Sequence, residues 1–389
     1  MKEKNFDATL GRVKTAMESG SRAPMWALVF ETVVKILTGF VVAALAFILF
    51  TIITKGGPHV SWEFLSQPPR DTGMAGGVWP AIFGTFFVVL FMIMMAIPLG
   101  VFGAVYLVEY SRGGFAARVI RAAVSNLAGV PSIVFGLFGL GFFVLFVGRN
   151  LDYMVYDIPR SESELVEKRA RLEANRTELE AEARTGAEAE AARRQLAPEE
   201  AQAFVAQRVV EATIPSTRPV FGQGAMFWAA ATLALLVLPV IIVSTEEALR
   251  AVPLSLREAS YALGSTKWQM VRNIVLPMAR SGILTGAILA VSRGAGELAP
   301  VLFVGVAAFK PDLPLTDPVD FGLFEVPVVN PFTSFMHLNY HIYTLATQSP
   351  DPDATRGLQF ATTAVLVLLT VALNLAAIRL RNLYSARNR

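Results

Sequence analysis

The chain has 389 residues, of which 54% are hydrophobic and only 17% are charged. Soluble proteins carry about 25% charged residues, and several apolar runs here reach the roughly 20 residues that cross a bilayer, so the composition argues against a soluble protein. The chain has no cysteine, which excludes disulfides, thiolate metal sites and cysteine nucleophiles, and its net charge of +3 indicates no acidic partner such as nucleic acid.

Six transmembrane helices are predicted, so the fold class is all-α and polytopic, with the lipid bilayer around it. In chain order, the apolar runs cover residues 36–54, 78–108, 127–147, 226–243, 283–306 and 361–378. The second run is longer than one crossing needs, and Pro98 should kink it or end its regular part. The first run lacks a small-residue cleavage site, which indicates a retained span rather than a removed signal peptide.

The basic residues of the short loops predict the orientation of the chain. Lys and Arg gather in residues 2–22, 112–121, 250–280 and 379–389, whereas the opposite short loops carry Lys55, Arg70, Lys310 and Arg356. Because cytoplasmic loops are enriched in Lys and Arg, both termini are expected in the cytoplasm. The predicted organisation is a cytoplasmic segment (1–35), spans one to three (36–147), an outer insertion (148–224), spans four to six (225–380) with a cytoplasmic loop (244–280) and an outer loop (307–357), and a cytoplasmic tail (381–389).

The predicted outer insertion is rich in Glu, Ala and Arg, unlike the spans on either side. Ser161 and Glu164 form a capping-box pattern, and Pro198 suits the first turn of a helix. Gly186 interrupts the helical pattern, while Leu165, Leu172 and Leu179 recur every seven residues. Two or three exposed helices are expected, with a short antiparallel coiled-coil hairpin as one arrangement. They would serve either as a docking element or as a solvated spacer. In the outer loop 307–357, the prolines argue against a long regular helix.

Sequence patterns for nucleotide and metal sites are missing from the chain. The phosphate-cradling pattern G-x-x-x-x-G-K-[ST] does not occur, and the GSTK at Gly264–Lys267 lacks the upstream glycine. His337 and His341 lie four residues apart and share a face if that stretch is helical, but no third metal ligand is close in sequence. We therefore expect packing or surface histidines rather than a metal pair.

The stretch Arg257–Pro277, REASYALGSTKWQMVRNIVLP, separates two apolar runs. It predicts a helix, a turn that Gly264 permits, and a second helix, with Pro277 marking a bend into the next span. Apolar anchors are offered by Tyr261, Leu263, Trp268 and Val271. Such an element either seats in a groove of a soluble partner or lies on the lipid surface as an amphipathic connector, and the residues alone leave both open.

Two charged residues, Arg293 and Glu297, fall inside the predicted fifth span. At a spacing of four they share a helical face, and each costs roughly 2.5–3.5 kcal/mol inside a span. Such a pair is a functional candidate, in which Arg293 would bind an anion and Glu297 would hold Arg293 until the anion displaces it. A structural ion pair is the alternative.

The start of the third span is a weaker candidate. Gly129, Pro131 and Ser132 open a helix whose free N–H groups would face an anion, whereas Gly136, Gly139 and Gly141 would allow close packing against another span. We favour packing.

The spacing of six residues in the stretch Arg257–Pro277 resembles a motif of a known family. The pattern E-A-[AS]-x3-G-x9-I-x-L-P is similar to the coupling-loop motif in the membrane subunits of binding-protein-dependent ABC importers. It falls on Glu258, Ala259, Gly264, Ile274, Leu276 and Pro277. The stretches Leu127–Leu140, Leu238–Pro253, Arg293–Phe303 and His337–Asp351 resemble the A-type permease subunits of phosphate importers. The resemblance runs from about Ser61 to the C-terminus, except for the insertion at 149–222, and Leu298 stands where that family would have threonine.

The resemblance implies a type I importer permease fold in the bacterial inner membrane, forming half of a translocation pore for inorganic phosphate. The implied partners are a homologous second permease, a dimer of ATPase subunits that bind ATP and Mg, and an external phosphate-binding protein. The chain would bind no cofactor or metal and would not itself be an enzyme. An importer of sulfate, molybdate or phosphonate is the alternative in the same class, and a membrane scaffold or sensor is the alternative from another class. An intramembrane enzyme is disfavoured because the spans lack a catalytic constellation.

Overall fold

The computed structural model describes residues 25–70, 75–111, 113–159, 161–194, 197–213, 219–315, 319–320, 325–326 and 328–386. Six helices within them are long and apolar enough to cross a membrane, which confirms the predicted number: Val29–His59, Trp79–Tyr110, Ser132–Tyr156, Met226–Arg250, Lys267–Gly296 and Pro352–Leu383. Over the described residues, the strands form two short antiparallel pairs, β1 (Pro69–Arg70) with β2 (Ala75–Gly76) and β3 (Val319–Asp320) with β4 (Glu325–Val326). The all-α polytopic fold class is confirmed.

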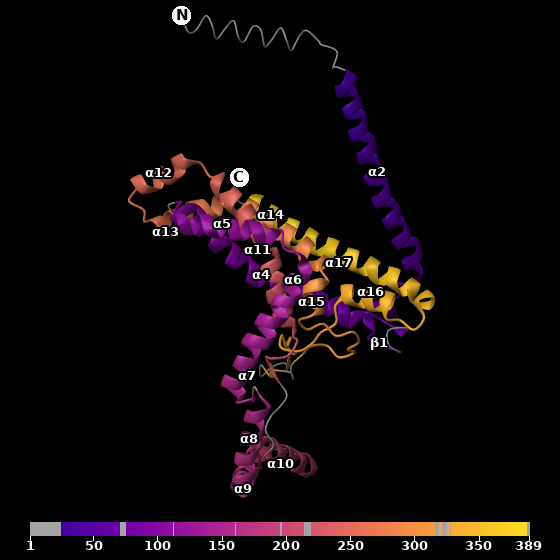
Figure 1. The fold of residues 1–389 in the computed structure, drawn as a ribbon, viewed down its shortest axis with the longest axis vertical. Coiled ribbons are helices and arrows are strands. Elements are labelled where there is room, and N and C mark those ends of the chain that lie inside the picture. Colours follow the sequence, from indigo (N-terminus) through magenta and orange to yellow (C-terminus); the bar gives the residue numbers. More distant parts are fainter. Residues whose placement is uncertain are drawn as a thin grey trace, which may run out of the picture.

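The helices are arranged around one central element (Figure 1). They are α2 (Met25–Gly56), α3 (Trp62–Ser66), α4 (Trp79–Val105), α5 (Phe115–Ala128), α6 (Ser132–Phe138), α7 (Arg149–Tyr156), α8 (Glu162–Ala174), α9 (Arg176–Arg193), α10 (Pro198–Thr213), α11 (Met226–Arg250), α12 (Leu254–Ala262), α13 (Lys267–Met270), α14 (Leu276–Gly296), α15 (Ala299–Leu302), α16 (Leu338–Thr347) and α17 (Pro352–Ala386). Three π-helical segments interrupt them, namely η3 (Tyr106–Tyr110), η4 (Gly139–Gly148) and η5 (Val271–Val275). A 3₁₀ turn, η1 (Gly57–His59), follows α2.

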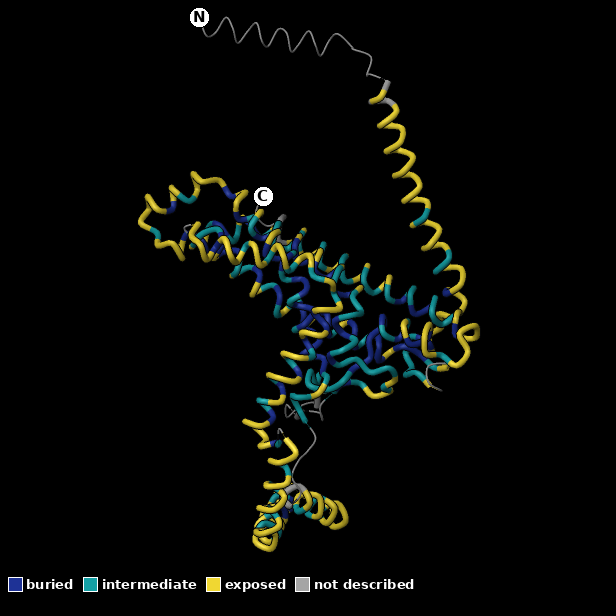
Figure 2. Tube along the Cα trace, in the orientation of Figure 1, coloured by how far each residue is buried: buried dark blue, intermediate teal, exposed yellow. Residues whose placement is uncertain are grey.

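The central helix is α11, which packs against both α4 and α14. In its most apolar window 67% of the residues are buried, more than in the other spanning helices described. Small residues allow the close approach, since a Cβ added to Gly100 of α4 would lie 2.5 Å from Cγ2 of Ile241 in α11. Figure 2 shows the buried residues concentrated where α4, α11 and α14 meet.

By contrast, α2 leaves the bundle almost completely exposed (Figures 1 and 2). None of the residues in its apolar window is buried. It meets α17 near its C-terminal end, where a Cβ on Gly56 would lie 2.6 Å from the carbonyl oxygen of Phe360. This helix begins at Met25, ahead of residue 36 where the first apolar run was predicted to start, and the part of the predicted cytoplasmic segment (1–35) before residue 25 lies outside the described residues.

Two other predicted boundaries are wrong for a physical reason. The third span starts at Ser132 rather than at 127, because Gly129 and Pro131 end the separate amphipathic helix α5. It then continues through η4 into α7, so residues 149–156, predicted as the start of the insertion, are helical and continuous with the third span. In the second span, Pro98 does not end the helix, since α4 runs through it to Val105.

The fifth span is also displaced relative to its prediction over 283–306. A continuous helix begins at Lys267, passes through η5 and ends at Gly296. Pro277, predicted to mark a bend into the next span, therefore lies within a continuous helix. It lies in the first turn of α14, directly after the π-helical turn Val271–Val275. The i→i+5 hydrogen bonds of that turn let the helix tolerate a residue that has no backbone N–H.

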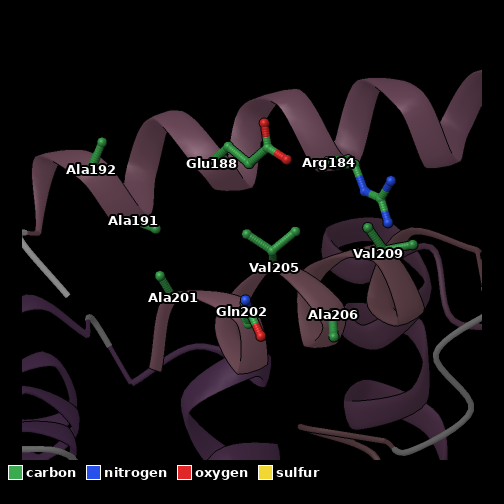
Figure 3. Close-up of a pocket in the computed structure, with 9 residues that line it drawn as sticks. All are labelled: Arg184, Glu188, Ala191, Ala192, Ala201, Gln202, Val205, Ala206 and Val209. Atoms are coloured by element: carbon green, nitrogen blue, oxygen red, sulfur yellow. The ribbon is translucent and has the colours of Figure 1, made fainter. Parts of the chain in front are cut away.

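The described residues of the insertion form three helices, α8, α9 and α10, which agrees with the prediction of two or three. Ser161 caps α8 by accepting a hydrogen bond from the backbone N–H of Glu164, and Pro198 opens α10 as expected. Gly186 does not interrupt the helix, because α9 passes through it and the break falls at Asn175 instead. The helices α9 and α10 pack side by side, with Val205 of α10 pointing towards α9 (Figure 3). The buried residues of α9 are Ala187 and Ala191, whereas the leucines that recur every seven residues, in α8 and α9, are only half-buried.

The two ends of the insertion are joined at its base by Asp152. This carboxylate is only 2% exposed and accepts backbone N–H bonds from Val220 (3.1 Å), Phe221 (2.7 Å) and Gly222 (2.7 Å). The indole N–H of Trp228 in α11 donates to the carbonyl of Phe221 at 2.6 Å. The chain therefore leaves the spans at α7 and returns to them through a single clamped turn.

Asp152→Ala should destabilise this base. The change leaves three backbone N–H groups without their acceptor, at a cost of about 1–3 kcal/mol for a buried unsatisfied group, and protease sensitivity in the chain around 219–224 should rise accordingly. Limited proteolysis in detergent measures this effect. The control is Asp157→Ala, because that carboxylate is exposed and pairs with Lys168 at 2.7 Å. An Asp152→Ala protein as resistant as the control would contradict the assignment.

Candidate functional site

The stretch predicted as helix–turn–helix folds in that way. Helix α12 ends at Ala262, and Gly264 takes a φ of +80°, a conformation that favours glycine. Thr266 then caps α13 through a reciprocal capping box with Gln269. The N–H of Gly264 donates to the carbonyl of Tyr261 at 2.9 Å, and the N–H of Ser265 donates to that of Ser260 at 3.2 Å. The glycine turn is thereby confirmed.

One face of this helix pair is buried against the bundle. Ser260, Met270 and Val271 are 3%, 1% and 0% exposed. Met270 and Val271 belong to an apolar cluster with Leu107 of η3 and Leu249 of α11. Val271 was predicted as an anchor for a partner, and this is wrong because its side chain holds the pair onto the bundle instead.

The other face is open and apolar at its tip. Leu263, in the turn between α12 and α13, is 88% exposed, and Leu254, Tyr261 and Trp268 are 64%, 45% and 47% exposed. The helix pair projects from the end of the bundle that lies away from α8–α10 (Figure 1). A rigid, capped element with exposed leucine, tyrosine and tryptophan side chains can seat in a groove of a partner, since aromatic residues are favoured at the centres of interfaces.

The six motif residues separate into two groups in space. Glu258, Ala259 and Gly264 are exposed on the helix pair, whereas Ile274, Leu276 and Pro277 are half-buried where η5 passes into α14. The first group lies on the surface that a partner would touch. The second lies in the joint between the helix pair and the fifth span.

Sequence reasoning missed the contacts that hold this helix pair in place. Arg257 Nη2 lies 3.0 Å from Oε1 of Glu109 in η3, and the same guanidinium donates to the carbonyls of Leu249 (2.7 Å) and Val252 (3.0 Å). The ammonium of Lys267 sits 5.0 Å from the ring centroid of Tyr110. The available signal was a single carboxylate, Glu109, directly after the apolar run of the second span.

Arg293 and Glu297 do form an ion pair, with 3.6 Å between Nε and Oε1, and their side chains are 36% and 22% exposed. They do not share a helical face, however, because α14 ends at Gly296 and Glu297 has an extended backbone (φ −84°, ψ 130°). Asn339, from α16, braces this helix end by donating its side-chain N–H to the carbonyl of Ala295 at 3.2 Å. The pair therefore lies where helix α14 ends rather than in the middle of a helix.

The glycines near the start of the third span pack closely at two of the three predicted positions. A Cβ on Gly136 would lie 2.6 Å from the carbonyl oxygen of Ala299, and one on Gly139 would lie 2.2 Å from Oγ1 of Thr232. Gly141 faces open space, so the packing role predicted for it is wrong.

His337 and His341 are buried, with 0% and 3% of each residue exposed. His337 packs edge-on against Phe335, and His341 packs edge-on against Phe309. No cluster of three or more potential metal ligands is found among the residues that the structure describes. Burial lowers the pKa of each histidine from 6.5 to about 4.

The stability of the protein should therefore fall in mild acid. Between pH 6.5 and about 4 the unfolded chain binds more protons than the folded chain at these two sites, so the free energy of unfolding decreases as the pH falls through this window and is unaffected above it. Each shift corresponds to at most roughly 3 kcal/mol. Thermal unfolding in detergent at pH 7.5 and pH 4.5 measures the loss. A His337→Gln/His341→Gln protein should lose less stability between these pH values, and a loss equal to that of the wild type would contradict the assignment.

Comparison with known proteins places these features in a family. Residues 96–389 match the family described as "Binding-protein-dependent transport system inner membrane component". The chain is 29% identical over 338 residues to the "Probable ABC transporter permease protein YqgI" of Bacillus subtilis (strain 168), covering 87% of this chain and 89% of that protein. It is 30% identical over 358 residues to the "Phosphate transport system permease protein PstA 1" of Mycobacterium tuberculosis (strain ATCC 25618 / H37Rv), covering 90% and 87%.

Among solved structures, a chain of a bacterial ABC transporter involved in the import of the acidic polysaccharide alginate is similar with a TM-score of 0.49 and 12% identity. That match covers 92% of this chain and 95% of the other. The family match spans most of the chain and includes the capped helix pair, its glycine turn and the fifth span. The chain therefore belongs to the family of binding-protein-dependent transport system inner membrane components.

Proposed function

We propose that this chain is the membrane-spanning permease subunit of an ATP-driven importer of inorganic phosphate and forms half of its translocation pore. The observation that carries the proposal is the 30% identity to a phosphate transport system permease over 90% of the chain. Further phosphate permeases are similar, among them the PstA protein of Haemophilus influenzae (strain ATCC 51907 / DSM 11121 / KW20 / Rd), at 29% identity over 76% of this chain and 79% of that protein. The chain would act in the bacterial inner membrane with both termini in the cytoplasm.

The α12–α13 pair is the proposed contact with the ATPase subunits. It is exposed, apolar at its tip and close to the basic residues that predict a cytoplasmic position. ATP and Mg would bind to the ATPase dimer, in agreement with the lack of a phosphate-cradling pattern in this sequence. Closure of the ATPase dimer would push Leu263 and its neighbours, and the spans would move in response.

Two further partners are proposed from exposed surfaces. The apolar side chains of α2 are exposed along its length, which suits packing against a homologous second permease within the bilayer. The end of the molecule that carries α8–α10 would face outwards, where an external phosphate-binding protein delivers substrate. The helices of the insertion would serve there as a docking element or as a solvated spacer.

The proposed substrate contact is Arg293. Its guanidinium matches the geometry of phosphate oxygens and forms two parallel hydrogen bonds with them. Glu297 competes with the anion for the same guanidinium in the 3.6 Å pair. Sulfate or molybdate would meet the same cation, so the test of the proposal includes them as competitors.

Uptake by a complex reconstituted in lipid vesicles tests this function. The chain, a second permease, the ATPase subunits and the external binding protein should together import labelled phosphate only when ATP is supplied inside, and unlabelled phosphate should compete far better than sulfate or molybdate. Restored phosphate uptake in a strain that lacks the gene checks the result in cells. ATP-dependent uptake of sulfate in preference to phosphate would overturn the substrate assignment.

A further inference from the structure

Three contacts converge on η3, the π-helical turn Tyr106–Tyr110 at the end of α4. The carboxylate of Glu109 meets Arg257 of α12, the ring of Tyr110 meets Lys267 of α13, and the carbonyl of Leu107 meets Arg121 of α5. Isolated π-helical turns are uncommon and are frequent at functional sites. This turn lies between the helix pair α12–α13 and the central helices of the bundle.

The Glu109–Arg257 contact is a buried ion pair. The side chains are 8% and 14% exposed, and the atoms Nη2 and Oε1 are 3.0 Å apart. Arg257 also donates to the carbonyls of Leu249 and Val252, which ties the C-terminal end of α11 to the start of α12. A buried charge pair of this kind is sensitive to the loss of either partner, because the remaining charge is left uncompensated.

The opposite side of η3 is tied to the bundle. Arg121 Nη2 donates to the carbonyl of Leu107 at 2.8 Å, and its Nε lies 3.4 Å from Oε1 of Glu246 in α11. Arg250 lies 3.7 Å from the other oxygen of Glu246. A movement of η3 therefore acts on α5 and α11 as well as on α4, of which it is the direct continuation.

Helix α4 connects η3 to the fifth span close to the candidate pathway. A Cβ on Gly294 of α14 would lie 2.3 Å from the sulfur of Met92 in α4, so these helices are in direct contact one residue away from Arg293. Close-packed helices shift as units rather than deforming continuously. The contacts from Arg257 to Glu109, along α4 to Met92, and on to Gly294 are contiguous.

We propose that Glu109 is a positioning residue that latches the α12–α13 pair to η3, so that a push on the pair is carried along α4 to the Arg293–Glu297 pair. The latch consists of the Glu109–Arg257 ion pair and the Lys267–Tyr110 contact. This inference rests on the proposed transport function, because it assigns the route by which the ATPase would drive that transport. The joint at Pro277 is then a second connection, directly into α14.

The test compares phosphate imported per ATP hydrolysed in the reconstituted complex. Glu109→Gln alone leaves the buried Arg257 uncompensated and should reduce assembly as well as import. The neutral double variant Glu109→Gln/Arg257→Gln removes both charges, together with the bonds of Arg257 to the carbonyls of Leu249 and Val252. It should assemble better than Glu109→Gln alone, yet its ratio of phosphate to ATP should fall about fivefold, a typical loss of coupling between sites. If the ion pair were purely structural, the double variant would regain the wild-type ratio of phosphate to ATP as it regained assembly.

Two further variants make the result decisive. Tyr110→Leu removes the exposed half of the latch without burying a charge and should lower the ratio about twofold, as expected for a weak cation–π contact. The control Asp353→Asn/Arg356→Gln neutralises an exposed ion pair in α17 and should leave the ratio at its wild-type value. If the double variant assembles and keeps the wild-type ratio of phosphate to ATP, the latch is overturned. If the double variant does not assemble, a wild-type ratio in Tyr110→Leu overturns the latch instead. Failure of the proposed function is distinct, since the wild-type complex would then hydrolyse ATP without importing phosphate.

Discussion

Replacing Gly264 with valine should reduce phosphate import by about tenfold while membrane insertion and ATP hydrolysis persist. Gly264 has a φ of +80°, and an L-residue in that conformation costs about 1–2 kcal/mol, with more for a β-branched side chain. Because about 1.4 kcal/mol changes an equilibrium constant tenfold, the native turn should lose about a factor of ten relative to its alternatives. Leu263, at the tip, would then no longer present its side chain to a partner in the same direction. Uptake and ATP hydrolysis measured on the same vesicles check this expectation.

The chain offers a matched control for backbone strain. Gly113 also has a positive φ, +73°, and a Cβ added there meets nothing within 4 Å, as at Gly264. Gly113→Val therefore introduces the same kind of strain in the loop between η3 and α5, outside the α12–α13 turn. It should import phosphate close to the wild-type rate. Normal import by Gly264→Val, with the protein inserted and assembled, would contradict the proposed role of the turn.

The parts that the sequence predicts correctly are those determined by local chemistry. Apolar runs of sufficient length identify the six spanning helices found among the described residues, because composition over about 20 residues is enough for that purpose. The turn at Gly264 and the start of α10 at Pro198 were also predictable, since both depend on the backbone preferences of a single residue.

The helix ends were less predictable, because a run of apolar residues does not show which backbone hydrogen bonds form at its ends. Pro277 would end a regular α-helix, yet the π-helical turn before it lets one helix run from Lys267 to Gly296. For the same reason Glu297 falls beyond the end of α14, and the spacing of four that placed it on a face with Arg293 does not apply. Their ion pair forms through the extended backbone of Glu297 instead.

The contacts of Glu109 could not be derived from the sequence at all. Its partner Arg257 is remote in the chain, and neither residue belongs to a repeating pattern that would bring them together. The coupling motif draws attention to Glu258, which is exposed, whereas the neighbouring Arg257 makes the buried contacts. Long-range pairs of this kind become visible only when the packing of α4, α11 and α12 is known.

The Arg293–Glu297 pair carries the second large expected effect. Arg293→Gln should lower phosphate import by at least about tenfold at low phosphate concentration, because a hydrogen bond to a charged group contributes about 1.5–3 kcal/mol. Glu297→Gln should have a different signature. It removes the carboxylate that competes with the anion for Arg293, so the KM for phosphate and the maximal rate should fall together, with tighter binding and slower release.

The contrast between the two variants separates a pathway from a structural ion pair. If the pair only fixes the end of α14, both variants should reduce assembly and neither should shift KM independently of the amount of complex. Arg176→Gln is the matched control, since Arg176 and Glu180 also lie four residues apart in an ion pair but on the exposed surface of the insertion. Should both pathway variants assemble and import phosphate at the wild-type rate and KM, the anion must cross elsewhere in the pore. The break between Gly296 and Ala299 would then serve only to let Asn339 and α16 close the outer end of the bundle.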